Sequence, residues 1–356
     1  MITVLYDPDG GGYDDISGYV MSGKFVRNKD FQQNTFSLKL DPTIMNSLMT
    51  NPLSGQLVQF KDGSDIVFSG MISGMNFSKS KNVFLEIKGA DASMDLFSNQ
   101  IPYSYTDELA SDIIVDLVSL YNGNDLSDHR LTATLTTSGG YITPTTQTID
   151  SFSSSSKRFY DALLELSIRE NTDGVNQFGY YVDGDNKLHF EPTGTSTSYV
   201  DYYDFLDASV GLNTIYRFNS VFLDCGEDLN GDRIVHTNYD TSTYAKFGGR
   251  IVIKYFDESQ LAAKIIKENP TFNNTEVLAE VENEAFAIIR KYLLFYGLIR
   301  KELQFTVEGR FNIQPNNKIR SPFELTTNES WVVSRVSQNF NINGHTTDVT
   351  MEEVIV

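Results

Sequence analysis

Short runs of alternating apolar and polar residues, separated by turn signals, occupy the first quarter of the 356-residue chain. Alternation with a period of two places every second side chain on the same face of a strand. The segment Lys61-Asp62-Gly63 stands between two of these runs, and Asp-Gly between apolar runs is a strong signal for a β-hairpin. Five such runs lie at close spacing: 19–26, 35–40, 57–60, 66–72 and 84–88. This pattern predicts a small antiparallel barrel or sandwich.

The periodicity changes after residue 100. Apolar residues recur at helical spacing between residues 109 and 120, and Thr106 is predicted to cap this helix. A second amphipathic helix is predicted over about residues 157–170. It leads into a hairpin over residues 178–190, whose turn Asp183–Asn186 is rich in residues that tolerate positive φ. The middle of the chain is therefore predicted to be mixed α/β.

Strands resume in the last third of the chain, at residues 216–223, 302–307, 330–336 and 346–351. Two helices are predicted to interrupt them, one over about residues 257–267 and one over about residues 275–296, with Gly297 as a C-cap. The first and last thirds look like two versions of one β architecture.

These patterns predict an α+β fold that is mainly β. It consists of two related antiparallel β-barrel domains of tube type, with an α/β domain between them and a helical insertion in the second barrel. The predicted boundaries are 1–99, 100–215 and 216–356, with the insertion at about 257–297. A chain of this length exceeds what one core usually serves, so several domains are expected.

The charge balance excludes some classes of partner. Twenty-eight basic residues stand against 47 acidic residues, a formal net charge of −19. Residues 100–215 hold most of the excess, with 17 acidic and 5 basic residues. Such a chain is poorly suited to neutralise DNA phosphates or an anionic membrane surface. No run approaches 18 apolar residues, so no membrane-spanning segment is expected. A single cysteine excludes an internal disulfide.

One acidic turn resembles the beginning of a calcium loop. Residues 228–232 have Asp-x-Asn-x-Asp spacing, but glycine stands at the fourth position instead of the sixth. Tyr239 occupies the twelfth position, where calcium loops carry Glu. Asn-Gly between strands favours a hairpin tip, and calcium binding stays open as the second interpretation.

The remaining candidates for chemistry are sparse. No nucleophile elbow, phosphate loop or zinc motif occurs, and the four histidines are scattered. Cys225 is predicted to be a buried thiol, and Trp331 a core residue on a strand instead of a sugar-binding platform. We therefore expect no enzyme activity, name no catalytic, cofactor-binding or metal-binding residue, and expect no cofactor.

Several strings resemble the phage tail and baseplate hub proteins, the late control protein D-like family of tailed phages and related contractile injection systems. The closing strings are Leu303–Gly309, Ile313–Ile319, Trp331–Gln338 and Gly344–Met351; the middle and opening strings are Gly179–Phe190, Gly55–Val58 and Val67–Ile72. The order of these elements matches the family over nearly the whole chain. The sequence departs from the family at Asn316-Asn317, where a glycine-containing turn is expected.

The resemblance implies a structural virion protein. Members of the family are homotrimers whose two barrels per chain make a ring of six quasi-equivalent barrels. This baseplate or tail-tip hub joins a six-fold tail tube to a three-fold spike or central fibre and lets DNA pass without specific binding. The implied partners are tail tube, distal tail and baseplate proteins, the spike or central fibre, and the tape measure protein. The implied location is the virion tail tip or baseplate, after assembly in the host cytoplasm.

Two other functions remain open at this point. A β-rich module that binds cell-surface carbohydrate in adhesion would act as an isolated monomer. A hydrolase that uses paired acids is the third alternative, although 47 acidic residues make such pairs undiagnostic. Oligomeric state separates the hub from the adhesion module.

Overall fold

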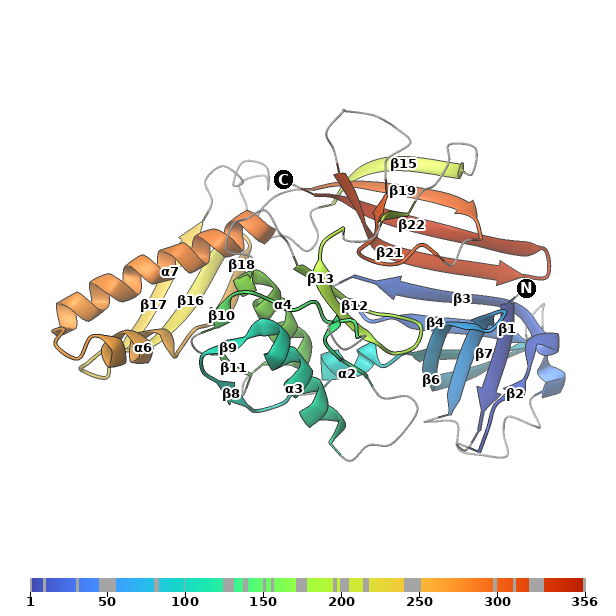
Figure 1. The fold of residues 1–356 in the computed structure, drawn as a ribbon. Helices are drawn as coiled ribbons and strands as arrows, with labels where there is room; N and C mark the ends of the chain where they lie inside the picture. The colour runs from blue at the N-terminus through green and yellow to red at the C-terminus, as the bar shows by residue number, and fades with distance from the viewer. Residues whose placement is uncertain are drawn as a thin grey trace.

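The computed structural model describes residues 2–8, 11–29, 32–44, 56–79, 83–98, 100–123, 131–136, 140–149, 152–154, 157–170, 178–194, 197–198, 205–213, 218–239, 251–296, 300–309, 312–319 and 330–354. The predicted α+β, mainly β class is confirmed: a 13-stranded sheet dominates, with smaller sheets and helices beside it (Figure 1). No described helix combines the length and the apolar character needed to cross a lipid bilayer.

The N-terminal part of the large sheet follows the predicted strands. It contains β1 (Ile2–Asp7), β2 (Asp14–Asp15), β3 (Val20–Asn28), β4 (Thr35–Leu40), β5 (Leu57–Asp62), β6 (Asp65–Lys79) and β7 (Val83–Ala90), with short 3-10 turns η1 (Ser17–Tyr19) and η2 (Pro42–Ile44). Their order in the sheet is β3-β4-β7-β6-β5-β1-β2. The hairpin predicted at Asp62-Gly63 is confirmed, because β5 pairs with β6 and Gly63 adopts a φ of 62°. Phe25, Phe36, Phe60 and Phe68 pack together in the core of this part.

The C-terminal part of the same sheet contains β14 (Thr197–Ser198), β15 (Phe205–Asn213), β19 (Arg300–Glu308), β20 (Lys318–Ile319), β21 (Ser330–Asn341) and β22 (Gly344–Val354). Strand β21 joins the two parts, since it pairs with β22 and, from Arg335 to Asn341, with β3. Each part nevertheless has its own apolar core, one around Phe60 and one around Trp331. The two predicted barrels are thus curled parts of one sheet, joined where β3 meets β21.

The middle of the chain packs short strands against helices. Its elements are α2 (Ser93–Ser98), β8 (Ser104–Tyr105), β9 (Glu108–Leu109), α3 (Ala110–Asn122), β10 (Thr148–Ile149), β11 (Phe152–Ser153), α4 (Phe159–Glu170), β12 (Phe178–Val182) and β13 (Leu188–Pro192). The predicted cap at Thr106 is wrong. Asp107 adopts a φ of 57°, and β9 pairs with β10, so the helix begins only at Ala110.

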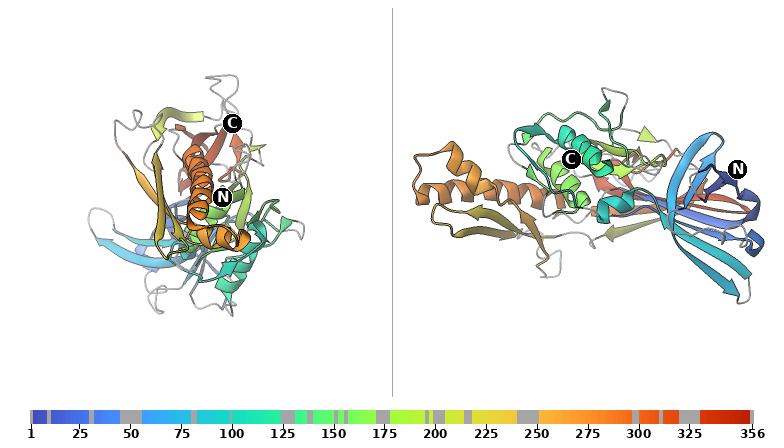
Figure 2. Two further views of the ribbon diagram at one scale, coloured as in Figure 1. Left: turned by 90° about the vertical axis from the view of Figure 1, so that its left-hand side faces the viewer. Right: turned by 90° about the horizontal axis from the view of Figure 1, so that it is seen from below.

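A three-stranded sheet and two helices project from the middle. The strands are β16 (Ser220–Glu227), β17 (Arg233–Tyr239) and β18 (Ile253–Asp257), and α6 (Leu261–Glu268) and α7 (Asn274–Tyr296) cover one face of this sheet (Figures 1 and 2). Both helices lie inside the range predicted for the helical insertion, while Gly297 falls outside the described residues. One apolar cluster runs from α3 and α4 through β16 to α7. The division at residues 99 and 215 stays a prediction.

Candidate functional site

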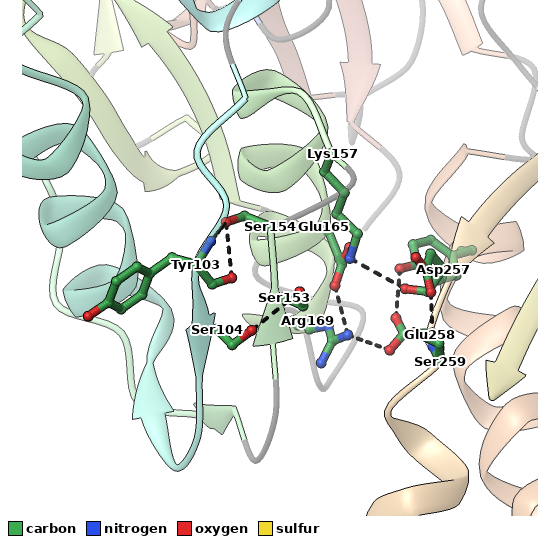
Figure 3. A network of polar contacts seen from close by, with 11 residues as sticks. Tyr103, Ser104, Ser153, Ser154, Lys157, Glu165, Arg169, Asp257, Glu258 and Ser259 are labelled. Carbon is green, nitrogen blue, oxygen red and sulfur yellow. Dashed lines mark hydrogen bonds and ion pairs between the residues drawn. The ribbon is translucent and has the colours of Figure 1, made fainter. Parts of the chain in front are cut away.

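A buried ionic network joins α4 to the projecting unit (Figure 3). Glu165 and Arg169, one turn apart on α4, form an ion pair with 2.7 Å between Oε1 and Nη2. Lys157 pairs with the same Glu165, and Arg169 also pairs with Glu258, which follows β18. Two cations and two anions thus balance each other. We name these four residues, Lys157, Glu165, Arg169 and Glu258, the ionic junction.

The electrostatics of the ionic junction depend on all four charges being present. Burial raises the pKa of Glu258, while Arg169 acts in the opposite direction. Burial acts to lower the pKa of Arg169, but Glu258 and Glu165 outweigh it and raise that pKa. Tyr292 adds a hydroxyl that donates to Glu258 Oε1 at 3.4 Å. Both carboxylates are therefore held by cations, an arrangement that orients two structural units relative to each other.

A second polar cluster connects the N-terminal strands to the middle of the chain. Asn34 donates from Nδ2 to Asp91 Oδ2 at 2.6 Å and to the carbonyl of Val182 at 3.1 Å. Asp91 also accepts from the backbone N–H of Ser93 at 2.9 Å. Asn186, in the β12–β13 turn, accepts from the N–H of Ala92 at 3.2 Å. These bonds fix the hairpin β12–β13 against the end of β7.

The carboxyl group of Asp91 in this cluster is buried and has a perturbed pKa. Burial raises its pKa to about 7, although the bonds from Ser93 and Asn34 act to lower it. No lysine or arginine forms an ion pair with Asp91 among the described residues. Its charge therefore changes near neutral pH, inside the contact between two structural units.

Arg27 links the two parts of the large sheet. This fully buried side chain on β3 donates to the Gln314 side chain and to the Ile313 carbonyl, the latter at 3.1 Å. Burial lowers its pKa to about 10, and Asp183 acts to raise it. A cavity of about 470 Å³ lies beside Arg27, between the turn of β5–β6 and the turn of β12–β13. The β12–β13 turn touches strand β6 at Gly184, where a Cβ atom would lie 2.5 Å from the Val67 carbonyl carbon.

The departure from the family pattern at Asn316-Asn317 has a simple structural basis. Asn316 adopts a φ of 67°, the left-handed conformation for which a glycine was expected. Its side chain donates to Glu191 Oε1 at 3.1 Å and to the Pro192 carbonyl at 3.3 Å. Asparagine therefore makes the turn and also attaches it to β13.

The acidic turn at residues 228–232 is a hairpin tip between β16 and β17. Asp228 Oδ1 accepts from the N–H groups of Asn230 and Asp232, at 2.8 and 2.9 Å, and Oδ2 accepts from Asn274 at 2.7 Å. Gly231 supplies the positive φ of the turn. The carboxylate thus closes the turn and attaches it to α7. Within the described ranges, no three His, Cys, Asp or Glu side chains are grouped to hold a metal ion.

The other residues considered from the sequence lie on strands. Cys225 is buried as predicted, and burial raises its pKa to about 12. Trp331 is 1% exposed, so the prediction of a core residue is confirmed. His189 stacks on Tyr181 and contacts Asp183 at 3.0 Å, a grouping that the sequence analysis missed. His129 lies outside the described residues.

Comparison with solved structures identifies proteins of the same fold. No protein-family model matches the sequence, and no curated protein matches it significantly. The 43 kDa tail protein of prophage MuSo2 from Shewanella oneidensis has a TM-score of 0.58 at 11% identity, covering 98% of each chain. The tail protein from Neisseria meningitidis MC58 has a TM-score of 0.54 at 14% identity, covering 99% of this chain and 96% of its own. The predicted resemblance to phage tail proteins is confirmed at the level of the fold.

Proposed function

We propose that this chain is a structural protein of a phage tail or of a related particle, and that it forms the hub ring of the tail tip or baseplate. The observation that carries the proposal is the pairing of β21 with β3, which sets two curled sheets with separate cores side by side in one chain. Three such chains supply six barrel-like units. A ring of this kind matches a six-fold tube on one side and a three-fold spike on the other.

The buried junctions support a rigid ring component. The ionic junction fixes the projecting unit to α4, and Arg27 ties the two parts of the sheet together. A ring that joins the tail tube to the spike requires rigid connections between its units. No step of catalysis is part of the proposal.

The net charge also suits passage of DNA. A formal charge of −19 disfavours adhesion of phosphates to the ring wall. In the proposed tail the chain contacts tail tube, distal tail and spike or central fibre proteins and the tape measure protein, and DNA passes without specific binding.

The carbohydrate-binding alternative loses its candidate platform, because Trp331 is packed in the core of the C-terminal part of the sheet. The hydrolase alternative gains no support from the ionic junction, whose two carboxylates are paired with cations.

Mass photometry of the purified chain, followed by negative-stain imaging, tests the proposal. Three chains of 40.1 kDa give about 120 kDa, and an end-on ring with an open centre is expected. A monomer at every concentration, with no ring in the images, would contradict a ring assembled by this chain alone. Binding of that monomer to cell-surface glycan would favour the adhesion module instead.

A further inference from the structure

One face of the C-terminal part of the large sheet carries a polar cavity. Strands β15, β19, β22, β21 and β3 lie side by side here, and their other face holds the apolar core around Trp331 (Figure 1). On the polar face, a cavity of about 370 Å³ extends from β15 to β3, and its lining includes Lys24, Arg335, Ser337 and Asp348. The described residues that line it all differ from those that line the cavity beside Arg27.

Ser337 lies at the floor of this cavity. Its neighbour Val336 belongs to the apolar core, so the alternation of side chains along β21 places Ser337 on the polar face. Ser337 is only 4% exposed, and its hydroxyl has no hydrogen-bond partner among the described residues. A buried hydroxyl without a partner is unfavourable. The Ser337 hydroxyl is therefore available to a ligand that occupies the cavity.

Two cations flank Ser337 on the polar face. Arg335 lies two residues before it on β21. Val26 pairs with Ser337 across the β21–β3 contact, and Lys24 lies two residues from Val26. Neighbours of this kind are about 7–8 Å apart, a distance that both long side chains can span. Both side chains are exposed, and neither forms a hydrogen bond or ion pair with another described residue. Two unpaired cations beside a buried hydroxyl favour an anionic ligand.

The arrangement of these donors favours a tetrahedral anion. The Lys24 ammonium and the Arg335 guanidinium approach from opposite sides along the strands, and the Ser337 hydroxyl lies between them. A carboxylate offers two oxygens in one plane, whereas phosphate and sulfate offer oxygens in four directions. Donors on three sides of one position therefore suit phosphate or sulfate better than a carboxylate.

Asp348 adds an acceptor that separates phosphate from sulfate. It lies directly opposite Ser337 across the β21–β22 pair. Its Oδ1 accepts from the Thr306 hydroxyl at 2.8 Å and its Oδ2 accepts from Asn339 Nδ2 at 2.7 Å, so each oxygen keeps a second lone pair. Hydrogen phosphate can donate its proton to such an oxygen, whereas sulfate has no proton to donate and is repelled. Asp207, the other acid in the lining, lies on β15, beyond β19 and β22.

We propose that this cavity binds hydrogen phosphate. Lys24, Arg335 and Ser337 donate to its oxygens, and Asp348 accepts from its protonated oxygen; we name these four residues the phosphate site. The ligand is the free ion or the terminal group of a phosphate monoester. The phosphate site lies within one chain, so it does not depend on the proposed ring. A DNA phosphodiester has no proton to donate, so the site is compatible with unbound passage of DNA.

Phosphorus NMR tests the proposal with the parent chain. The line width of inorganic phosphate is followed as protein is added, at constant ionic strength and at about pH 6, near the second pKa of a phosphate monoester. We expect a dissociation constant of about 1 mM or below. Glycerol phosphate should displace the bound phosphate if the site accepts a monoester, and only inorganic phosphate should compete if the site takes the free ion. Sulfate and dimethyl phosphate should need at least about tenfold higher concentrations.

Variants locate the phosphate within the cavity. Lys24→Met and Arg335→Met should each weaken phosphate binding by at least about tenfold, and Ser337→Ala by about threefold. Lys88→Met makes the same change of charge on β7, away from the cavity, and Ser209→Ala removes a hydroxyl at its β15 end. Both controls should bind phosphate like the parent chain.

A further variant tests the role of Asp348. Asp348→Asn replaces the acceptor by an amide that can donate, so sulfate should compete about as well as phosphate with this variant.

The proposal is overturned if the parent chain does not broaden the phosphate line, or if Lys88→Met weakens binding as much as Lys24→Met, because the attraction would then be general. Equal effects of Ser209→Ala and Ser337→Ala would exclude the β21–β3 end as the binding position. Equal competition by sulfate and phosphate with the parent chain would overturn the assignment to hydrogen phosphate. These competition measurements use only the parent chain, so they do not depend on the folding of any variant.

Discussion

Replacing Arg169 by methionine should lower the free energy of unfolding by more than a surface ion pair contributes to it. The substitution keeps much of the side-chain volume but removes the positive charge between Glu165 and Glu258. Glu258 then keeps only the hydrogen bond from the Tyr292 hydroxyl and the electrostatic attraction of Lys157. These two interactions are too weak to compensate the desolvation of a buried carboxylate. Breaking a buried pair on one side costs about 3–5 kcal/mol.

A second substitution identifies the cause of that loss. Glu258→Gln in the Arg169→Met background removes the uncompensated charge, so the double variant should be more stable than Arg169→Met alone. The effect should also depend on pH. Burial already raises the folded-state pKa of Glu258, and loss of Arg169 raises it further. Because protonation relieves the penalty, Arg169→Met should lose less stability as the pH falls towards the unfolded-state value of 4.5.

Urea unfolding followed by the helical circular dichroism signal is the appropriate assay. The helices lie on both sides of the ionic junction, whereas Trp331 reports on the C-terminal part of the sheet. A chain with several cores need not unfold in one step, so the helical transition is compared between variants instead of a global free energy.

Lys88→Met is the matched control. Lys88 pairs with Glu86 at 3.1 Å in an exposed position, where loss of the pair should cost less than about 1 kcal/mol. If Arg169→Met costs no more stability than this control, or if Glu258→Gln destabilises the Arg169→Met variant further, Arg169 does not compensate a buried charge on Glu258.

Three further predictions concern single positions. Asp91→Asn should flatten the pH dependence of stability: the pKa of this buried carboxyl is about 7 when folded against 3.8 when unfolded, so the parent chain loses stability as the pH rises between these values. An unchanged slope in urea midpoints measured across that range would contradict it. Gly184→Ala should cost about 1–3 kcal/mol because its Cβ would meet the Val67 backbone, whereas Gly18→Ala, whose Cβ meets no atom within 4 Å, should change the midpoint little. Asn316→Ala should cost about 1–2 kcal/mol more than Asn316→Gly, because both lose the same side-chain bonds and only alanine is strained at positive φ; equal midpoints would contradict this.

Local sequence was sufficient for the strands and turns whose signals lie within a few residues. The hairpin at Asp62-Gly63 and the hairpin over 178–190 both form where their turn residues predict them. Alternation in Thr35–Leu40 correctly identified a strand with Phe36, Leu38 and Leu40 buried. These features depend on the backbone preferences of neighbouring residues, so they can be predicted from the local sequence.

Local signals failed where a contact from elsewhere in the chain competed with them. Thr106 with two acidic residues after it has the form of a helix cap, but Glu108 and Leu109 pair with Ile149 and Thr148. The pairing partner lies about forty residues further along the chain, so the helix start could not be read from its own neighbourhood.

The sequence by itself determined the class of fold, the order of elements and the absence of recognisable catalytic motifs. The tertiary structure decided which charges are buried together: Arg27 meets Gln314 from 287 positions away, and Arg169 meets Glu258 from 89 positions away. It also left Ile253 and Tyr255 uncovered on one face of the projecting sheet. Periodicity shows that one side of a strand is apolar. Only the packed fold determines whether another element covers that side.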